Sequence, residues 1–416
     1  MTRFDPQQAG HFAPRFLADD RHFLFFVTGR LEARGVYIGN LEGLETKRLF
    51  DADTPAVYTA AGYLLFVREG KLLAQDFDPV RLEPKGGPFA VAEHVNRGTV
   101  LSASAAGPVA YRTPSPESGQ RNLVWIDRSG REMDKVVYSE GTASQGPSLS
   151  HDGKRVAVFS NKDGNMDIWA YETEHRTWAR ITSDPNDDIF PLWSPDDSRI
   201  VFGSNRKADN QNLYIKLLNS ALGSDELLLS TRDYKFPMDW SLDGRFLLYE
   251  LINDQKNFDI RALKMDGTRT SLEVANGEFN ERLPQFSPDG KWVAYQSDRT
   301  GRFEIYVQPF PGPGGASPVS INGGQQVRWN PNGKELFYIA PDDRLMSVPI
   351  RFTPDGKTLE AGTALTLFVT NVGSTAPNLN RQQYMVSPNG QSFVMNSMPE
   401  TAASPITVIL NWKPRP

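Results

Sequence analysis

The chain has 416 residues, of which 23% are charged and 39% hydrophobic, a composition typical of a folded globular protein. Its formal net charge of −5 and its pI of about 5.7 exclude the basic surface that nucleic acid or an anionic membrane would attract. The absence of cysteine excludes disulfides, thiolate nucleophiles and cysteine-ligated metals.

The N-terminus carries no apolar stretch of signal-peptide length, and no apolar run approaches the roughly 18 residues of a membrane-spanning helix. We therefore expect no direct insertion of this chain into a membrane. The sequence by itself assigns no compartment.

One short pattern recurs along the chain, roughly 45 residues from one copy to the next. It reads Pro, two residues of which one is often aromatic, Ser, Pro or His, Asp-Gly, and then an alternating apolar run. Faint copies come first, around residues 14–39, 56–76 and 100–127. Clear copies follow at 147–153, 191–197, 237–244 and 284–290, and two more open at 327 and 384.

Each clear unit reads as four short strands. The first ends at the Pro-Asp-Gly turn, where Pro presets φ and Asp-Gly tolerates positive φ. The second alternates with period two, as in 199–204 and 291–297, and a polar loop leads to a third strand and a short fourth. Four antiparallel strands in a repeat of this length are typical of one blade of a β-propeller.

The sequence therefore predicts an all-β protein, one propeller domain over 1–416 with nine blades. The expected repeats are 14–55, 56–98, 99–146, 147–190, 191–236, 237–283, 284–325, 326–382 and 383–416. We expect the N-terminal strand 2–4 to share the ninth blade, because shared closure removes exposed sheet edges. Eight blades with a merged N-terminal pair is the main alternative. Two smaller rings are disfavoured, because no Pro/Gly/Ser linker interrupts the pattern.

The segments 286–290, 294–299 and 301–306 resemble the TolB-type, WD-repeat-like propeller repeat, without the Gly-His and Trp-Asp of true WD repeats. Segments 62–70, 123–128, 307–312, 333–338 and 406–412 are similar to the C-terminal propeller of large bacterial serine/threonine kinases of the type common in Acidobacteria. That resemblance implies a sensor or interaction domain in the periplasm or otherwise outside the cytoplasmic membrane. It leaves open whether the chain is a free-standing relative or a piece of a longer kinase.

Kinase chemistry itself is not expected. The sequence lacks a Gly-rich ATP loop, a His-Arg-Asp catalytic loop and Asp-Phe-Gly. A Gly-x-Ser-x-Gly elbow is also missing, and the five histidines show no zinc-ligand spacing. We predict a non-enzymatic protein without cofactor or metal.

Triplets of Ser, Asp or Asn, and a basic residue follow several second strands, at 160–162, 204–206 and 297–299. With the loops that precede the first strands, they should lie on one rim of the ring, where a ligand would bind. The residues expected on this rim are Asn161, Lys162, Asn205, Arg206, Asp298, Arg299, Asp187, Asp188, Asn280, Glu281 and Arg282. Their recurrence in several repeats favours a structural role instead, in which Ser and Asp cap turns and Arg ties neighbouring blades together, because a ligand site usually breaks repeat symmetry.

Aromatic residues occupy one first-strand position in several repeats, at Trp193, Trp240, Phe286 and Trp329. We interpret them as core between blades rather than as a stacking platform for sugars. The predicted function is a sensor or binding module for a protein, peptide or envelope ligand, acting as a monomer and not binding nucleic acid. The alternative is a propeller hydrolase or lyase, which would need paired carboxylates in the central channel.

Overall fold

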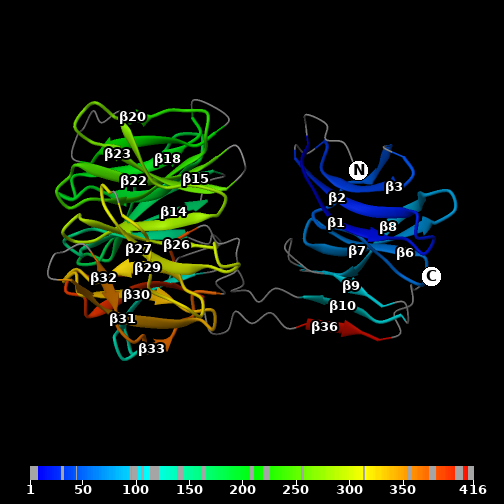
Figure 1. The fold of residues 1–416 in the computed structure, drawn as a ribbon. Coiled ribbons are helices and arrows are strands. Elements are labelled where there is room, and N and C mark those ends of the chain that lie inside the picture. Colours follow the sequence, from blue (N-terminus) through cyan, green and yellow to red (C-terminus); the bar gives the residue numbers. More distant parts are fainter. Residues whose placement is uncertain are drawn as a thin grey trace. The chain divides into compact units, whose positions relative to one another are not determined.

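The computed structural model describes residues 8–29, 32–43, 45–93, 95, 101–104, 107–112, 121–137, 145–161, 165–206, 210–218, 225–253, 257–312, 314–353, 358–373, 381–398 and 406–410. This part of the chain contains strands and turns but no helix, as Figure 1 shows, so the predicted all-β class is confirmed. Among these residues, therefore, none forms a helix long and apolar enough to cross a membrane.

The chain divides into two compact units rather than the single ring predicted for 1–416. Unit 1 comprises Met1–Ser118 and Thr401–Pro416, and unit 2 comprises Gly119–Glu400. The predicted closing strand 2–4 and the rim residue Lys162 lie outside the described residues.

Unit 1 contains three antiparallel sheets in its described part. The first is β1 (Gln8–Phe16), β2 (His22–Gly29), β3 (Gly35–Asn40) and β4 (Thr46–Phe50). The second is β5 (Val57–Tyr58), β6 (Tyr63–Arg68), β7 (Lys71–Asp78) and β8 (Glu83–Ala92). The third joins β9 (Ser102–Ala103) and β10 (Val109–Arg112) to the C-terminal β36 (Ile406–Ile409).

Unit 2 contains six sheets in its described part (Figure 1). One is built from both ends of the unit, β34 (Tyr384–Val386), β35 (Ser392–Ser397), β11 (Asn122–Asp127) and β12 (Glu132–Val137). Next come β13 (Gln145–Leu149), β14 (Arg155–Asn161), β15 (Met166–Glu172), β16 (Thr177–Arg180), and then β17 (Asp188–Trp193), β18 (Arg199–Ser204), β19 (Asn212–Leu217), β20 (Glu226–Leu229). The fourth sheet is β21 (Lys235–Trp240), β22 (Phe246–Ile252), β23 (Phe258–Lys264), β24 (Ser271–Ala275), and the fifth is β25 (Glu281–Phe286), β26 (Trp292–Ser297), β27 (Glu304–Pro309), β28 (Ser317–Pro318). The sixth is β29 (Gln325–Trp329), β30 (Glu335–Ile339), β31 (Arg344–Phe352), β32 (Leu359–Ala361), with β33 (Leu365–Val369) also pairing to β31.

These six sheets close into a ring. The first strands β13, β17, β21, β25, β29 and β34 contact one another in that order, and β34 contacts β13 again. Each first strand pairs only with the second strand of its own sheet, so the first strands form the inner edge of the ring. A closed ring of small antiparallel sheets, most of them four-stranded, is a β-propeller, and in the described part of unit 2 it has six blades.

The ring closure corrects the predicted pairing. Segment 383–416 does not form a single blade: β34 and β35 complete the sheet of β11, while β36 pairs with β10 in unit 1. Segments 109–111 and 123–127, assigned to one repeat by sequence, therefore belong to different units. A period-two strand shows its own alternation but not its distant partner, so sequence spacing could not reveal this exchange.

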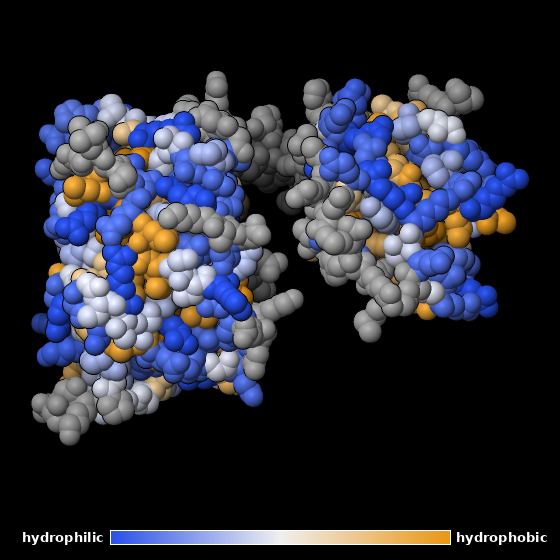
Figure 2. Space-filling model, turned by 90° about the horizontal axis from the view of Figure 1, so that it is seen from above, coloured by the Kyte–Doolittle hydropathy of each residue, from blue (hydrophilic) through white to orange (hydrophobic). Residues whose placement is uncertain are grey.

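Aromatic and aliphatic side chains fill the space between blades. Trp193, Trp240, Phe286 and Trp329 are all buried, as predicted for interblade core. Trp193 packs with residues of its own and the preceding blade, and its indole Nε1–H donates to the carbonyl oxygen of Ser148 at 3.0 Å. Seen from the face drawn in Figure 2, both units present a mostly hydrophilic surface broken by small hydrophobic areas.

Candidate functional site

The described rim residues lie where the first strands begin and where the second strands end. In the register of the third blade Asp188 is opposite Ser204, and in that of the fifth Glu281 is opposite Ser297. The triplets that follow the second strands therefore meet the loops that precede the first strands, as expected. Asn161 ends β14 at the corresponding place in the second blade.

Two blades build the same polar network from these residues. In the third blade Arg206 donates to both oxygens of Asp188 at 2.8 and 2.7 Å, and in the fifth Arg299 donates to Glu281 at 3.1 Å. One residue earlier, the backbone N–H of Asp187 donates to Asn205 at 3.0 Å, and that of Asn280 donates to Asp298 at 2.9 Å.

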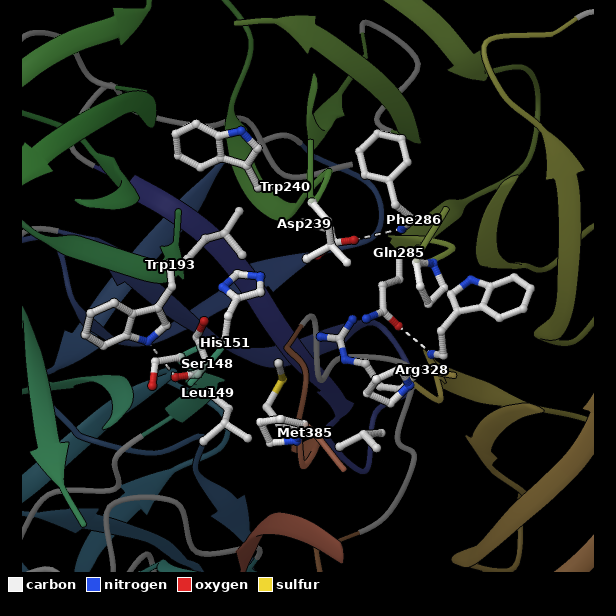
Figure 3. Close-up of a pocket in the computed structure, with 18 of the residues that line it drawn as sticks. Ser148, Leu149, His151, Trp193, Asp239, Trp240, Gln285, Phe286, Arg328 and Met385 are labelled. Carbon is white, nitrogen blue, oxygen red and sulfur yellow. Dashed lines mark hydrogen bonds between the residues drawn. The ribbon is translucent and has the colours of Figure 1, made fainter. Parts of the chain in front are cut away.

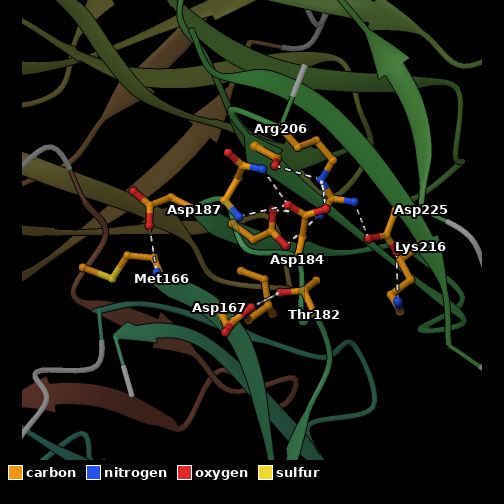
Figure 4. Close-up of polar contacts among 12 residues, drawn as sticks. Met166, Asp167, Thr182, Asp184, Asp187, Arg206, Lys216 and Asp225 are labelled. Atoms are coloured by element: carbon orange, nitrogen blue, oxygen red, sulfur yellow. Dashed lines mark hydrogen bonds and ion pairs between the residues drawn. The ribbon is translucent and has the colours of Figure 1, made fainter. Parts of the chain in front are cut away.

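The network also joins neighbouring blades (Figure 4). Asp187 accepts a hydrogen bond from the backbone N–H of Met166 in the preceding blade at 2.8 Å, and Asn280 accepts one from Phe258 at 3.3 Å. Arg282 is buried, with its guanidinium carbon 3.8 Å from the centre of the Phe258 ring, and it donates to Glu250 at 3.4 Å. These contacts match the structural role weighed for the triplets, and a ligand role for the rim stays a prediction.

Asp188 is the deepest carboxylate of the rim, with none of its side chain exposed. Burial raises the pKa of Asp188, while hydrogen bonds from Ser204 and Arg206 act to lower it. Arg206 also donates to Asp225 at 2.6 Å, and its guanidinium lies 4.7 Å from the centre of the Tyr214 ring. The positive charge of Arg206 is thus paired with carboxylates of the fold itself.

A second candidate site opens at the other end of the first strands. A cavity of about 290 Å³ is lined by residues from all six first strands and their turns, so it is the mouth of the central channel (Figure 3). Each strand contributes the residue two positions before the Ser or Asn of its turn. These residues are Ser148, Leu192, Asp239, Gln285, Arg328 and Met385.

A β-bulge in the first strand prepares this arrangement. Four positions before the turn residue, Phe190, Leu283 and Gln326 adopt φ of 55°, 49° and 58°. The strand register shifts at the same places. Such bulges re-aim the side chains that follow, at a cost that the ring must compensate.

Two of the cavity residues tie their blade to the next. Asp239 accepts a hydrogen bond from the backbone N–H of Phe286 at 2.7 Å, and Gln285 accepts one from that of Trp329 at 2.6 Å. Burial raises the pKa of Asp239 to about 6, against the opposing charges of Arg328 and His151. Burial also lowers the pKa of Arg328.

His151 reaches the same cavity from the turn after β13, although sequence spacing gave it no role. Its Nδ1 lies 3.1 Å from an oxygen of Asp197, which also accepts the backbone N–H of His151 at 2.9 Å. The signal that could have identified the cavity is the aligned position before the turn. It changes from Ser to Leu, Asp, Gln, Arg and Met around the ring, whereas the next position is aromatic in four of the six blades and the turn position after that is always Ser or Asn.

The raised pKa of Asp239 predicts an unusual pH dependence of stability. Because its folded pKa lies above the ordinary value of 3.8, the ionised carboxylate disfavours the folded state, and stability falls as pH rises from about 4 to about 6. Asp239→Asn can keep the bond from Phe286. We expect it to raise the free energy of unfolding by about 3 kcal/mol at pH 7.5 and by only about 0.5 kcal/mol at pH 4.

Urea unfolding at the two pH values measures this difference. The matched control is Asp266→Asn in an exposed turn, where a side-chain bond from Thr268 lowers the pKa of the carboxyl, so the sign reverses. A destabilised Asp239→Asn protein at pH 7.5 would contradict the burial effect.

Unit 2 is thus a β-propeller whose central channel opens into the cavity described above. Comparison with known proteins agrees with the propeller class. Residues 109–282 match the family model of the TolB beta propeller domain. The chain is 24% identical over 169 residues to the Tol-Pal system protein TolB of Helicobacter pylori, covering 39% of this chain and 40% of that protein. It is therefore aligned with about two fifths of the length of this curated relative.

Two further similarities extend over more of the chain. An uncharacterised protein of Agrobacterium fabrum is 29% identical over 242 residues, covering 56% of this chain and 78% of that protein. A solved structure assigned to a TolB of Agrobacterium tumefaciens has a TM-score of 0.50 at 19% identity, covering 66% of this chain and 97% of that one. The TolB-type repeat resemblance is supported, and the match to the solved structure supports the fold alone.

Proposed function

We propose that the protein is a non-catalytic binding module that receives a protein, peptide or envelope ligand at the channel mouth of unit 2. The observation that carries this proposal is the loss of repeat symmetry at the six aligned cavity positions, three of which are Asp239, Gln285 and Arg328. Structure alone requires no such variety, because these positions share one place in each blade. A concave site with a few polar groups among apolar walls is typical of ligand binding.

We further propose a periplasmic or otherwise extracytoplasmic location, and a relationship to receptor-type serine/threonine kinases. The similarity to a Tol-Pal system protein supports the location in part, whereas the kinase relationship depends on sequence resemblance alone. A kinase reading frame adjacent to the gene would support the relationship.

A hydrolase or lyase is the rival function. It would need two carboxylates converging on a substrate. Among the described residues that line the cavity, Asp239 is the one carboxylate, and it accepts a structural hydrogen bond. We therefore expect a captured ligand to be recovered with its mass unchanged.

The test is capture of partners from an envelope extract by the intact chain and by two variants. Met385→Trp should fill the cavity, whereas Met133→Trp makes the same change on the exposed surface of β12. We expect the Met133→Trp protein to retain the partners of the wild type, and Met385→Trp to lose at least nine tenths of them. Retention by a folded Met385→Trp protein would place the site elsewhere, and a glycan array serves as negative control.

A further inference from the structure

Arg328 occupies an unusual place for a cation. It projects from β29 into the cavity (Figure 3), only 6% of its surface is exposed, and its Nε is buried without a hydrogen-bond partner. Within the described part of the chain it forms no ion pair within 4.0 Å. Buried charges are normally paired, because desolvation is costly, so a guanidinium that faces a cavity without an ion-pair partner is suited to bind an anion.

The neighbours of Arg328 restrict what that partner can be. Asp239 is the nearest opposing charge, but it is engaged by Phe286 and does not contact Arg328 within 4.0 Å. The Gln285 oxygen is likewise used by Trp329, which leaves its amide N–H groups directed to the cavity side of the strand. The rest of the wall is largely apolar and aromatic.

We propose that the channel mouth binds a monocarboxylate carried on an apolar group, with Arg328 and the Gln285 amide on the carboxylate and apolar side chains of the wall, such as Leu192 and Met385, around the apolar part. This inference rests on the proposed function and names the chemistry of its ligand, such as the C-terminal end of a peptide. A planar carboxylate matches the two-pronged guanidinium. A doubly charged phosphate would meet one cation and the nearby Asp239 carboxylate, and it has no apolar part to fill the walls.

Asp239 makes this binding pH-dependent. Its carboxylate faces Arg328 from β29 and His151 from the turn after β13, and His151 in turn faces Asp197. When Asp239 is ionised it repels an incoming carboxylate and competes for Arg328. When the pH falls through about 6 it takes up a proton, and that repulsion ends.

The experiment compares N-acetyl-leucine with N-acetyl-leucinamide, which differ in the carboxylate alone. Trp193, Trp240 and Trp329 line the cavity, so indole fluorescence and calorimetry both report occupancy. We expect the intact wild-type chain to bind the acid at least tenfold more tightly than the amide. Arg328→Met should reduce that ratio to about one, and Arg351→Met, the same change at an exposed position of β31, should leave it unchanged.

A second variant keeps the inference testable if Arg328→Met does not fold. Asp239→Asn should bind N-acetyl-leucine at least threefold more tightly than the wild type at pH 8, and equally at pH 5, where Asp239 is largely protonated in the wild type. Equal binding of acid and amide, a ratio insensitive to Arg328→Met, or preferential binding of inorganic phosphate would overturn the inference. Those results concern only the chemistry of the ligand. Whether the channel mouth is the binding site is tested separately, by partner capture with Met385→Trp.

Discussion

Phe393→Ala should lower the free energy of unfolding of unit 2 by about 3–5 kcal/mol. Phe393 lies on β35, is fully buried, and makes edge contacts with Phe337 at 5.0 Å and with Phe368 at 5.8 Å between ring centres. Those two rings belong to the preceding blade, and β35 pairs directly with β11. The substitution therefore opens a cavity in the one sheet that holds the two ends of unit 2 together.

Urea unfolding followed by tryptophan fluorescence measures the effect, and limited proteolysis should show earlier cleavage. The control is Phe352→Ala, the same truncation at a partly exposed ring on β31, which should cost well under half as much. Equal losses from the two variants would mean that ring stability does not depend on the closing sheet.

This closing sheet shows which parts of the fold could be predicted from the sequence and which could not. Within a blade the strands are local, so the Pro-Asp-Gly turns and period-two runs were sufficient to predict β18 at 199–204 and β26 to within one residue. The aromatic first-strand position was also readable, because the large side chains that recur there in four blades, Trp193, Trp240, Phe286 and Trp329, fill the same interblade space. Both signals are contained in a single repeat.

The strand pairing among the segments 109–112, 122–127, 384–397 and 406–409 joins different repeats, so no single repeat signals it. Each of these strands has the same alternation as its neighbours, and the choice of partner is decided by which pairing closes a ring. The sequence therefore predicted the right kind of unit but joined the ends wrongly, and it counted as one ring what the structure divides in two.

The two candidate sites differ for a related reason. The rim triplets were predicted as a candidate site because they recur. In the structure the recurring residues form a repeated network, in which Arg206 pairs with Asp188 and Arg299 with Glu281. The cavity residues were not predicted as a site, because they differ from blade to blade. In a repeat protein, shared residues report the architecture, and a ligand site is better sought where aligned positions differ.

The Arg206→Met substitution tests whether the rim residues bind a ligand or only stabilise the ring. Its loss leaves the fully buried Asp188 carboxylate without its bidentate partner, so we expect the free energy of unfolding to fall by about 3–5 kcal/mol at pH 7.5. Burial already raises the pKa of Asp188, and without Arg206 the carboxyl would protonate still more readily. The loss should therefore be smaller at pH 4, and Asp188→Asn in the same chain should recover much of it.

Arg245→Met removes an equally charged but exposed guanidinium beside Asp243 and should cost at most about 0.5 kcal/mol. Partner capture completes the comparison. If folded Arg206→Met protein, with or without Asp188→Asn, still captures the partners of the wild type, the rim charges serve the ring and binding belongs to the channel mouth. If capture is lost while the Arg206→Met, Asp188→Asn protein is as stable as the wild type, Arg206 contacts the ligand and the rim prediction is right, because a purely structural arginine could not affect binding without affecting the fold.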